Sequence, residues 1–401
     1  MNFIFVSPQF PDSYYLFCEG LKKRNVNVLG IGDTPHNQLS QQVINSLTEY
    51  YYVTNLEDYE QMLRAVAFFT FKYGKIDWIE SNNEYWLYQD ALLRKDFNIK
   101  HGFSLQQLND YQSKEKMKEF YYKANVPCAR YCMVKDFNTI LKFVEEVGYP
   151  IVIKPNKGVG ACQTYKIENE EQLKQYGTYD LKNMIAEEYV NGDICSFDGI
   201  TNSKNEILFC TSHMYGTPLM DVVNDKSEVS CYSRIKIPEK LMDIGKRVVK
   251  AFDTTSRFFH FEFFILKEDH DNLGKKGDYV GLEVNMRPPG GFIPDLINYA
   301  YDFNIFDLWA EMIIDDTFIV NKQKVYSTGF AGRWLNKEYA YSIEELQGKY
   351  GAHILFVIHL PDALKDAMGD YVIGVRFGSE KETKQFIKNA QKQKELGVRR
   401  N

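Results

Sequence analysis

Apolar stretches and amphipathic helical stretches alternate along the first 110 residues, and this alternation limits the fold more than any other feature of the chain. Strands that alternate with helices favour a parallel sheet covered by helices. The pattern predicts strands at 2–7, 26–32, 50–53 and 76–82 and helices at 14–23 and 57–73. The loop after the first strand, SPQFPDS, lacks the Gly-x-Gly-x-x-Gly pattern. This part is therefore predicted to be a Rossmann-like module without a dinucleotide site.

The pattern changes after residue 110. Ser113 and Asp136 can each cap a helix, because their side chains accept from free backbone N–H groups of a first turn. Further strands are predicted at 149–155, 164–167, 185–190, 258–266 and 279–286, and the tail offers two strand-like stretches and a helix from Glu380. The expected fold class is therefore α/β combined with α+β.

Composition excludes several classes of protein. The chain of 401 residues has a net charge of −6 and no basic run longer than the three residues Lys22-Lys23-Arg24, which argues against a nucleic-acid partner. No stretch approaches the roughly 20 apolar residues of a membrane span. The start, MNFIFVSPQF, resembles a first strand more than a signal peptide. The seven cysteines of the chain are scattered and fit free thiols in a reducing compartment, so we expect a cytoplasmic protein.

One predicted strand carries the strongest chemical signal. In EVNMRPPGG, alternation places Glu283, Asn285 and Arg287 on the same face. Oxygen ligands beside a cationic group suit Mg²⁺ that bridges phosphates. The preceding strand offers His260 and Glu262 in the same way, so antiparallel pairing would let Glu262 and Glu283 share two ions. A solvated polar face is the plainer alternative, but the surrounding phenylalanines favour a buried site whose carboxylates need a partner.

Two further segments carry weaker signals. Lys154 ends a strand beside the turn at 156–161, and a lysine next to glycine N–H groups can hold phosphates. Exposed lysines also end many strands, so this feature alone is unspecific. The segment 185–193 can offer free backbone groups to an adenine edge, or it can be an ordinary strand and turn. The chain has no Walker A motif, which excludes a P-loop site.

Taken together and in order, these segments resemble the ATP-grasp superfamily, in particular carboxylate–amine ligases with a layout like that of biotin carboxylase and carbamoyl-phosphate synthase. The resemblance spans about 110–300 and is carried by Ser113-Lys114, Pro127, YPIVIKP, NKGVGA, IAEEYVNGD, HFEFF and EVNMRPPGG. It implies a Rossmann-like domain at 1–110, an ATP-grasp domain at 111–320 with a small lid-bearing subdomain at about 125–190, and a C-terminal α+β unit at 321–401.

The resemblance also implies roles for individual residues. The nucleotide would be contacted by phosphate-binding lysines, a covering loop and a hinge that receives adenine: Lys114 and Lys154; Lys157, Gly158, Gly160 and Ala161; Glu187, Glu188, Tyr189 and Val190. The implied Mg²⁺ ligands are Glu262, Glu283 and Asn285, and Arg287 would stabilise the acyl-phosphate step. Many ATP-grasp proteins place a ribose-binding glutamate where this chain has Ile194, and Asp193 is expected to substitute for it.

The expected function is that of an ATP-dependent ligase with two Mg²⁺ ions, or Mn²⁺ in their place. It would activate a small carboxylate, with an amino acid the favoured choice, for attack by an amine. A carboxylating or phosphorylating enzyme of the same scaffold, or a catalytically silent nucleotide-binding module, are the alternatives. Arg234 and Arg333 are candidate carboxylate clamps, although structural roles suit both. The resemblance also allows a homodimer.

Overall fold

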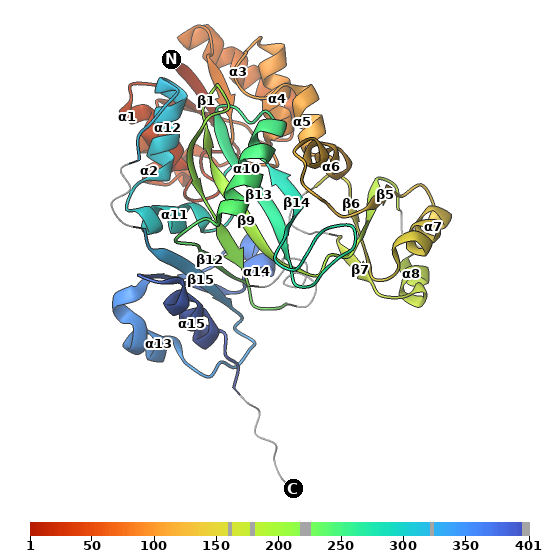
Figure 1. Ribbon diagram of the computed structural model, residues 1–401. Helices are drawn as coiled ribbons and strands as arrows, with labels where there is room; N and C mark the ends of the chain where they lie inside the picture. Colours follow the sequence, from red (N-terminus) through yellow and green to blue (C-terminus); the bar gives the residue numbers. More distant parts are fainter. Residues whose placement is uncertain (159–162, 177–180, 217–225, 321–324, 395–401) are drawn as a thin grey trace.

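The computed structural model describes residues 1–158, 163–176, 181–216, 226–320 and 325–394. These residues form a four-stranded sheet, a second four-stranded sheet and a nine-stranded sheet. Figure 1 shows the three parts: the N-terminal domain with α1 to α5 at the top, a small subdomain that projects to one side, and the long central sheet continuing into the C-terminal helices.

The N-terminal domain is a parallel sheet in the order β3-β2-β1-β4. Its strands are β1 Asn2–Val6, β2 Asn27–Gly32, β3 Glu49–Tyr52 and β4 Trp78–Glu80. Its helices are α1 Tyr15–Lys23, α2 Gln41–Ser46, α3 Tyr59–Tyr73, α4 Leu87–Asp96 and α5 Leu105–Tyr111. The predicted alternation of strand and helix is confirmed. The buried strand residues alternate between two apolar clusters, because neighbouring side chains face opposite sides of the sheet.

The small subdomain follows α6 (Lys114–Lys123). An antiparallel sheet in the order β5-β8-β6-β7 is covered by two helices. The elements are β5 Tyr131–Met133, α7 Phe137–Val147, β6 Ile151–Pro155, β7 Tyr165–Ile167, α8 Glu170–Tyr176 and β8 Met184–Glu188. Asp136 caps α7 as predicted, since its side chain accepts from the Thr139 N–H.

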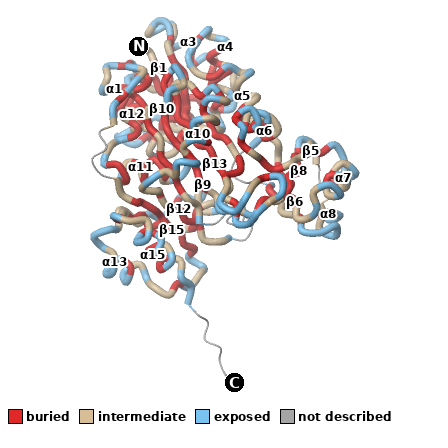
Figure 2. Tube along the Cα trace, in the orientation of Figure 1, coloured by how far each residue is buried: buried red, intermediate tan, exposed pale blue. Residues whose placement is uncertain are grey.

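The nine-stranded sheet runs β14-β13-β9-β11-β12-β15-β17-β16, with β10 paired to β9. The first part of it contains β9 Gly192–Thr201, β10 Ile207–Thr211, β11 His213–Tyr215, β12 Ser230–Ser233, α10 Glu239–Ala251, β13 Arg257–Leu266 and β14 Tyr279–Asn285. Two helices follow, α11 Ile293–Tyr301 and α12 Ile305–Asp315. Figure 2 shows buried residues running along β1, β9 and β13.

The C-terminal segment continues the same sheet, because β15 pairs antiparallel with β12. Its elements are β15 Ser327–Arg333, α13 Ile343–Tyr350, β16 Ile354–His359, α14 Asp362–Met368, β17 Tyr371–Phe377 and α15 Glu380–Ala390. The two strand-like stretches and the helix expected in the tail are therefore present as β16, β17 and α15. Within the described ranges, no helix combines the length and the apolar character that a membrane crossing requires.

One aromatic cluster joins the N-terminal domain to the central sheet. The Phe17 ring of α1 packs edge-on against Phe258 of β13 and against Phe306 and Trp309 of α12, with ring centroids 5.9, 4.7 and 5.0 Å away. Aromatic pairs at such separations contribute beyond their buried area. This packing fixes the loops of the N-terminal domain relative to β13 and β14.

Candidate active site

The two glutamates singled out in the sequence face each other. β13 and β14 pair antiparallel, with Glu262 opposite Glu283 and His260 opposite Asn285. Residues directly opposite in an antiparallel pair have their side chains on the same face, about 5 Å apart at Cβ. The structure therefore brings Glu262, Glu283 and Asn285 together on one wall, as the alternation predicted.

The Glu283 carboxyl is electrostatically unsatisfied. Burial raises its pKa, Lys114 opposes this rise, and the nearby charge of Glu262 adds to it. Its carboxylate accepts no hydrogen bond from any residue that the structure describes, and the same holds for the Asn285 amide oxygen. Two facing carboxylates and an amide with free oxygens suit a hard divalent cation. Histidine, cysteine, aspartate and glutamate form no group of three or more suited to a metal in the described ranges.

Lys114 approaches this wall from the first turn of α6. Ser113 caps the helix by accepting from the Lys116 N–H at 3.3 Å. The Lys114 Nζ donates to the carbonyl of Gly158 at 2.8 Å. Burial lowers the pKa of Lys114, and only part of this is offset by Glu283. Gly158 has φ of +120°, a conformation that side chains rarely adopt, so glycine is required where the loop turns its carbonyl to Lys114.

Lys154 belongs to a buried triad with Glu187 and Lys118. The Glu187 carboxylate lies 2.8 Å from the Lys154 Nζ and 2.9 Å from the Lys118 Nζ. Burial alone would raise the pKa of Glu187, but the two lysines outweigh it and lower the pKa to about 2. The pKa of Lys154 is raised, because its attraction to Glu187 exceeds the cost of burial. The triad ties α6 to β6 and β8 and leaves one net positive charge inside the site.

The segment from Glu187 to Val190 joins the small subdomain to the central sheet. Arg130 holds the Glu188 carboxylate through its Nε at 2.8 Å and its Nη2 at 2.7 Å, and its backbone N–H adds a third contact at 2.7 Å. The backbone N–H of Glu188 donates to the Arg130 carbonyl at 3.0 Å. The backbone N–H and carbonyl of Val190 bond to no other described residue. Val190 thus keeps free backbone groups beside a rigidly held neighbour. Tyr189 lies between them, with the Lys166 Nζ over its ring.

The other predicted nucleotide contacts are either exposed side chains or lie outside the described residues. Asp193 is largely exposed and pairs with Lys267 at 2.8 Å. Lys157 is exposed and donates to the Asn109 side chain at 3.1 Å. Gly160 and Ala161 fall in the segment 159–162, which lies outside the described residues.

A cavity of about 140 Å³ connects these elements. It is lined by the loop after β4, by the residue that follows α5, by α6, by the turn after β6 and by β14, through Glu84, Tyr85, Gln112, Met117, Lys157, Gly158, Glu283, Val284 and Asn285. Arg287 lies beside it, with its Nε 3.5 Å from Glu84 Oε2 and its Nη1 donating to the Pro288 carbonyl at 2.8 Å. Glu84 therefore brings a carboxylate from the N-terminal domain to the predicted catalytic arginine.

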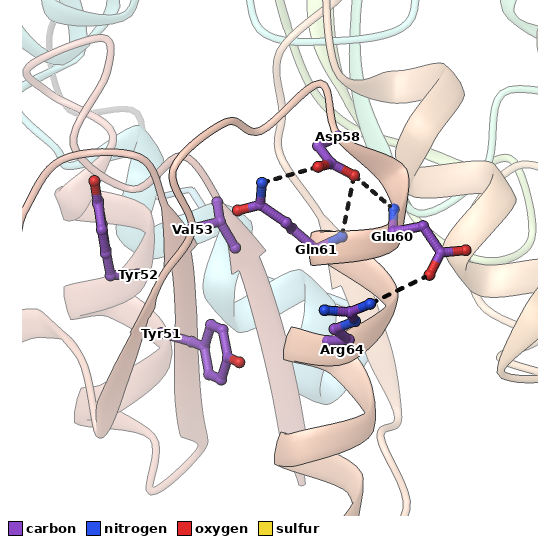
Figure 3. A pocket seen from close by; sticks show the side chains of 7 residues that line it. All are labelled: Tyr51, Tyr52, Val53, Asp58, Glu60, Gln61 and Arg64. Atoms are coloured by element: carbon purple, nitrogen blue, oxygen red, sulfur yellow. Dashed lines mark hydrogen bonds and ion pairs between the residues drawn. The ribbon is translucent and has the colours of Figure 1, made fainter.

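A larger cavity, about 390 Å³, lies on the N-terminal domain (Figure 3). It is lined by Tyr51, Tyr52, Val53, Asp58, Glu60, Gln61 and Arg64. Its charged groups serve α3: Asp58 caps the helix, and Glu60 pairs with Arg64 one turn later. It contains none of the predicted site residues, so the smaller cavity is the better candidate despite its size.

Comparison with protein families identifies the kind of domain that contains β13 and β14. Residues 110–291 match the ATP-grasp domain. The chain contains an ATP-grasp domain. The resemblance stated from the sequence is therefore confirmed, and the matched segment covers α6, the small subdomain and the wall formed by β13 and β14.

Proteins similar to this chain include an L-arginine-specific L-amino acid ligase of Bacillus subtilis, 25% identical over 259 residues, which are 61% of this chain and 60% of that protein. The match thus spans less than two thirds of that relative. A crystal structure of an L-amino acid ligase from Bacillus licheniformis superposes with a TM-score of 0.73 at 14% identity and covers 96% of both chains. N5-carboxyaminoimidazole ribonucleotide synthetase from Thermotoga maritima gives 0.68 at 18% identity and 97% of both chains. These likenesses confirm the predicted fold class.

Three residues around the ATP-grasp site escaped the sequence patterns. Lys118 sits one helical turn after Lys114, a position that an exposed lysine would also occupy. Glu84 and Tyr85 follow β4, and their position at the carboxyl end of a parallel strand was the one available signal, because ligands bind at that edge. Neither candidate clamp lines the cavity. Arg333 is buried, with its Nε donating to the Ala390 carbonyl and its guanidinium over Tyr339, and Arg234 donates to the Met214 sulfur.

Proposed function

We propose that the protein is an ATP-dependent ligase that joins a small carboxylate to an amine through an acyl phosphate and releases ADP and phosphate. The observation that carries this proposal is the facing pair of Glu262 and Glu283 on a wall that Lys114 approaches from α6. The match to the ATP-grasp domain at 110–291 supports ATP as the nucleotide. The similarity to two amino acid ligases favours an amino acid as the carboxylate substrate.

Each group has a part in the proposed reaction. Lys114 and Lys154 hold phosphate oxygens, and the free backbone groups of Val190 bind the adenine edge. Glu262, Glu283 and Asn285 would hold two Mg²⁺ ions, or Mn²⁺ in their place, which neutralise the phosphates. Lys157 and Gly158 cover the phosphates together with Gly160 and Ala161. Glu187, Glu188 and Tyr189 shape the hinge, and Asp193 contacts the ribose.

The chemistry needs no nucleophile from the protein. A carboxylate oxygen of the substrate attacks the γ-phosphorus, ADP leaves, and an acyl phosphate forms. The amine then attacks the carbonyl carbon and loses a proton, and phosphate leaves with one oxygen of the original carboxylate. Arg287 stabilises the negative charge that develops in both steps, because its guanidinium lies beside the cavity, 3.5 Å from Glu84 and bonded to the Pro288 carbonyl.

The test is ADP release from ATP in a matrix of amino acids and other small carboxylates against amines, with bicarbonate as one of the carboxylates. We expect ADP only where both a carboxylate and an amine are present. Glu60→Gln, in the N-terminal cavity, is the matched control that keeps activity, whereas Arg287→Ala lowers it by about 100–1000-fold. Release of AMP and pyrophosphate, or equal ADP release without any amine, would refute the proposal.

A further inference from the structure

A buried carboxylate lies beneath the wall that carries Glu262. Asp198 of β9 is fully buried and stands opposite His260 in the pairing of β9 with β13. Its Oδ1 lies 2.5 Å from the His260 Nδ1, and its Oδ2 lies 2.7 Å from the His213 Nδ1. The hydroxyl of Ser196 also donates to Oδ2. Both oxygens of Asp198 are thus engaged, and three donors from three strands fix its position.

His260 connects this carboxylate to the candidate site. Its Nδ1 faces Asp198, and its Nε2 lies 3.3 Å from Glu262 Oε1. An imidazole held at both nitrogens cannot rotate about its χ angles without losing a contact. One oxygen of Glu262 is therefore anchored through a rigid ring, while the other remains available. Glu283, directly opposite, has no such anchor among the described residues.

We propose that Asp198 and His260 are positioning residues that hold the Glu262 carboxylate ready for a divalent cation. The inference rests on the proposed function only in taking Glu262 as a cation ligand. A free glutamate would turn away from the like charge of Glu283, and binding would then have to fix its rotamer at an entropic cost. Groups that orient a metal ligand from behind typically change metal affinity by about 10–100-fold when they are removed.

The cluster also supplies its own control. His213 contacts the same carboxylate of Asp198, but its Nε2 is buried and has no partner among the described residues. Replacing His213 by asparagine removes a buried imidazole and keeps a donor near Asp198. It therefore disturbs the cluster without touching Glu262. If the cluster only provides hydrogen-bond partners for the buried Asp198, replacing His213 and replacing His260 should change Mn²⁺ affinity equally.

The experiment measures Mn²⁺ binding by electron paramagnetic resonance, in the presence and absence of ADP, together with the thermal midpoint of each variant. His260→Asn keeps a donor for Asp198 but loses the contact to Glu262, and we expect about tenfold weaker Mn²⁺ binding in the ADP complex. His260→Gln places an amide donor near Glu262 and should restore affinity to within about threefold of wild type. His213→Asn should bind Mn²⁺ as wild type does.

Two results would overturn the inference. One is wild-type Mn²⁺ affinity in His260→Asn, whatever its thermal midpoint. The other is an equal loss of affinity in His213→Asn and His260→Asn, which would assign the cluster a structural role alone. Failure of the ligase proposal would give a different result. Wild type would bind Mn²⁺ and ADP, and the variants would show the predicted order of Mn²⁺ affinities, yet no pair of substrates would lead to release of ADP.

Discussion

Glu262 and Glu283 stand directly opposite each other in the antiparallel pair of β13 and β14. Burial and the charge of Glu262 raise the pKa of Glu283, so the ligand-free protein holds two carboxylates in a costly arrangement. Lys114, whose own pKa is lowered by burial, only partly offsets that cost. A bound cation would stabilise such an arrangement, as we propose for Mg²⁺.

The variant Glu283→Gln separates the effect of Glu283 on stability without ligand from its effect on Mg²⁺ binding. We expect its thermal midpoint without ligand to equal or exceed that of wild type, because the repulsion with Glu262 is removed. We also expect Mg²⁺ with ADP to stabilise the variant far less than wild type, and turnover to fall at least about 100-fold. Calorimetric melting with and without Mg²⁺ and ADP checks both. A lower midpoint combined with normal stabilisation by Mg²⁺ and ADP would show that Glu283 is structural.

The buried triad of Lys118, Lys154 and Glu187 gives the protein an acid-sensitive stability. The pKa of Glu187 is lowered to about 2, from an ordinary value of 4.5, so its contribution is complete above 4.5 and is lost as pH falls towards 2. This contribution is about 3 kcal/mol. Glu187→Gln should therefore lower the free energy of unfolding by about that amount at neutral pH, with a penalty that shrinks on acidification. Urea unfolding between about pH 7 and pH 3 measures it.

The control for this prediction is Glu168→Gln, which removes an exposed partner of Lys166 and should leave stability unchanged at every pH. A penalty for Glu187→Gln that stays constant on acidification would mean that the triad does not hold the Glu187 carboxyl in its charged form.

Arg287 is expected to act in the transition state more than in ATP binding. Arg287→Ala should lower kcat by about 100–1000-fold and leave the KM for ATP within about threefold. Arg287→Lys should recover little, because a lysine lacks the planar fork that can contact Glu84 and an oxyanion together. Arg64→Ala, on the N-terminal cavity, is the matched control. A proportional rise in the KM for ATP would instead assign Arg287 to nucleotide binding.

Asp193 and Lys267 form an exposed ion pair at 2.8 Å, and the two partners allow a test of ribose binding. Asp193→Asn should weaken ADP binding by about tenfold, since it replaces a charged hydrogen-bond acceptor. Lys267→Ala breaks the same pair from the other side and should leave ADP affinity unchanged. Titration calorimetry compares them. Equal affinities in the two variants would show that Asp193 serves only the ion pair.

Local patterns predicted much of the fold, since strand and helix follow from periodicity within short windows. The same period of two predicts that Glu283, Asn285 and Arg287 share one face of a strand. In the structure β14 ends at Asn285, so only Glu283 and Asn285 lie on the strand, and Arg287 lies in the bend that follows it. That Glu262 faces Glu283, however, depends on the register of β13 and β14, which includes an irregularity immediately after Glu262. Alternation predicts a face but not which residue stands opposite.

Contacts between segments far apart in the chain could not be predicted from the sequence. Glu84 lies near Arg287 because the N-terminal domain packs against β13 and α12, for example through Phe17, and no local pattern encodes that docking. The pairing of β15 with β12, which carries the tail strands into the central sheet, likewise joins residues far apart in the chain. The domain boundaries and the individual site roles remain predictions.

The most direct test of the proposed chemistry follows an oxygen atom. The carboxylate substrate found in the ADP-release matrix is labelled with ¹⁸O, and the released phosphate is examined by mass spectrometry. Formation of an acyl phosphate predicts phosphate that carries one ¹⁸O for each turnover, and Arg287→Ala should form this labelled phosphate about 100–1000-fold more slowly. Unlabelled phosphate formed at the same rate as the amide would contradict the account.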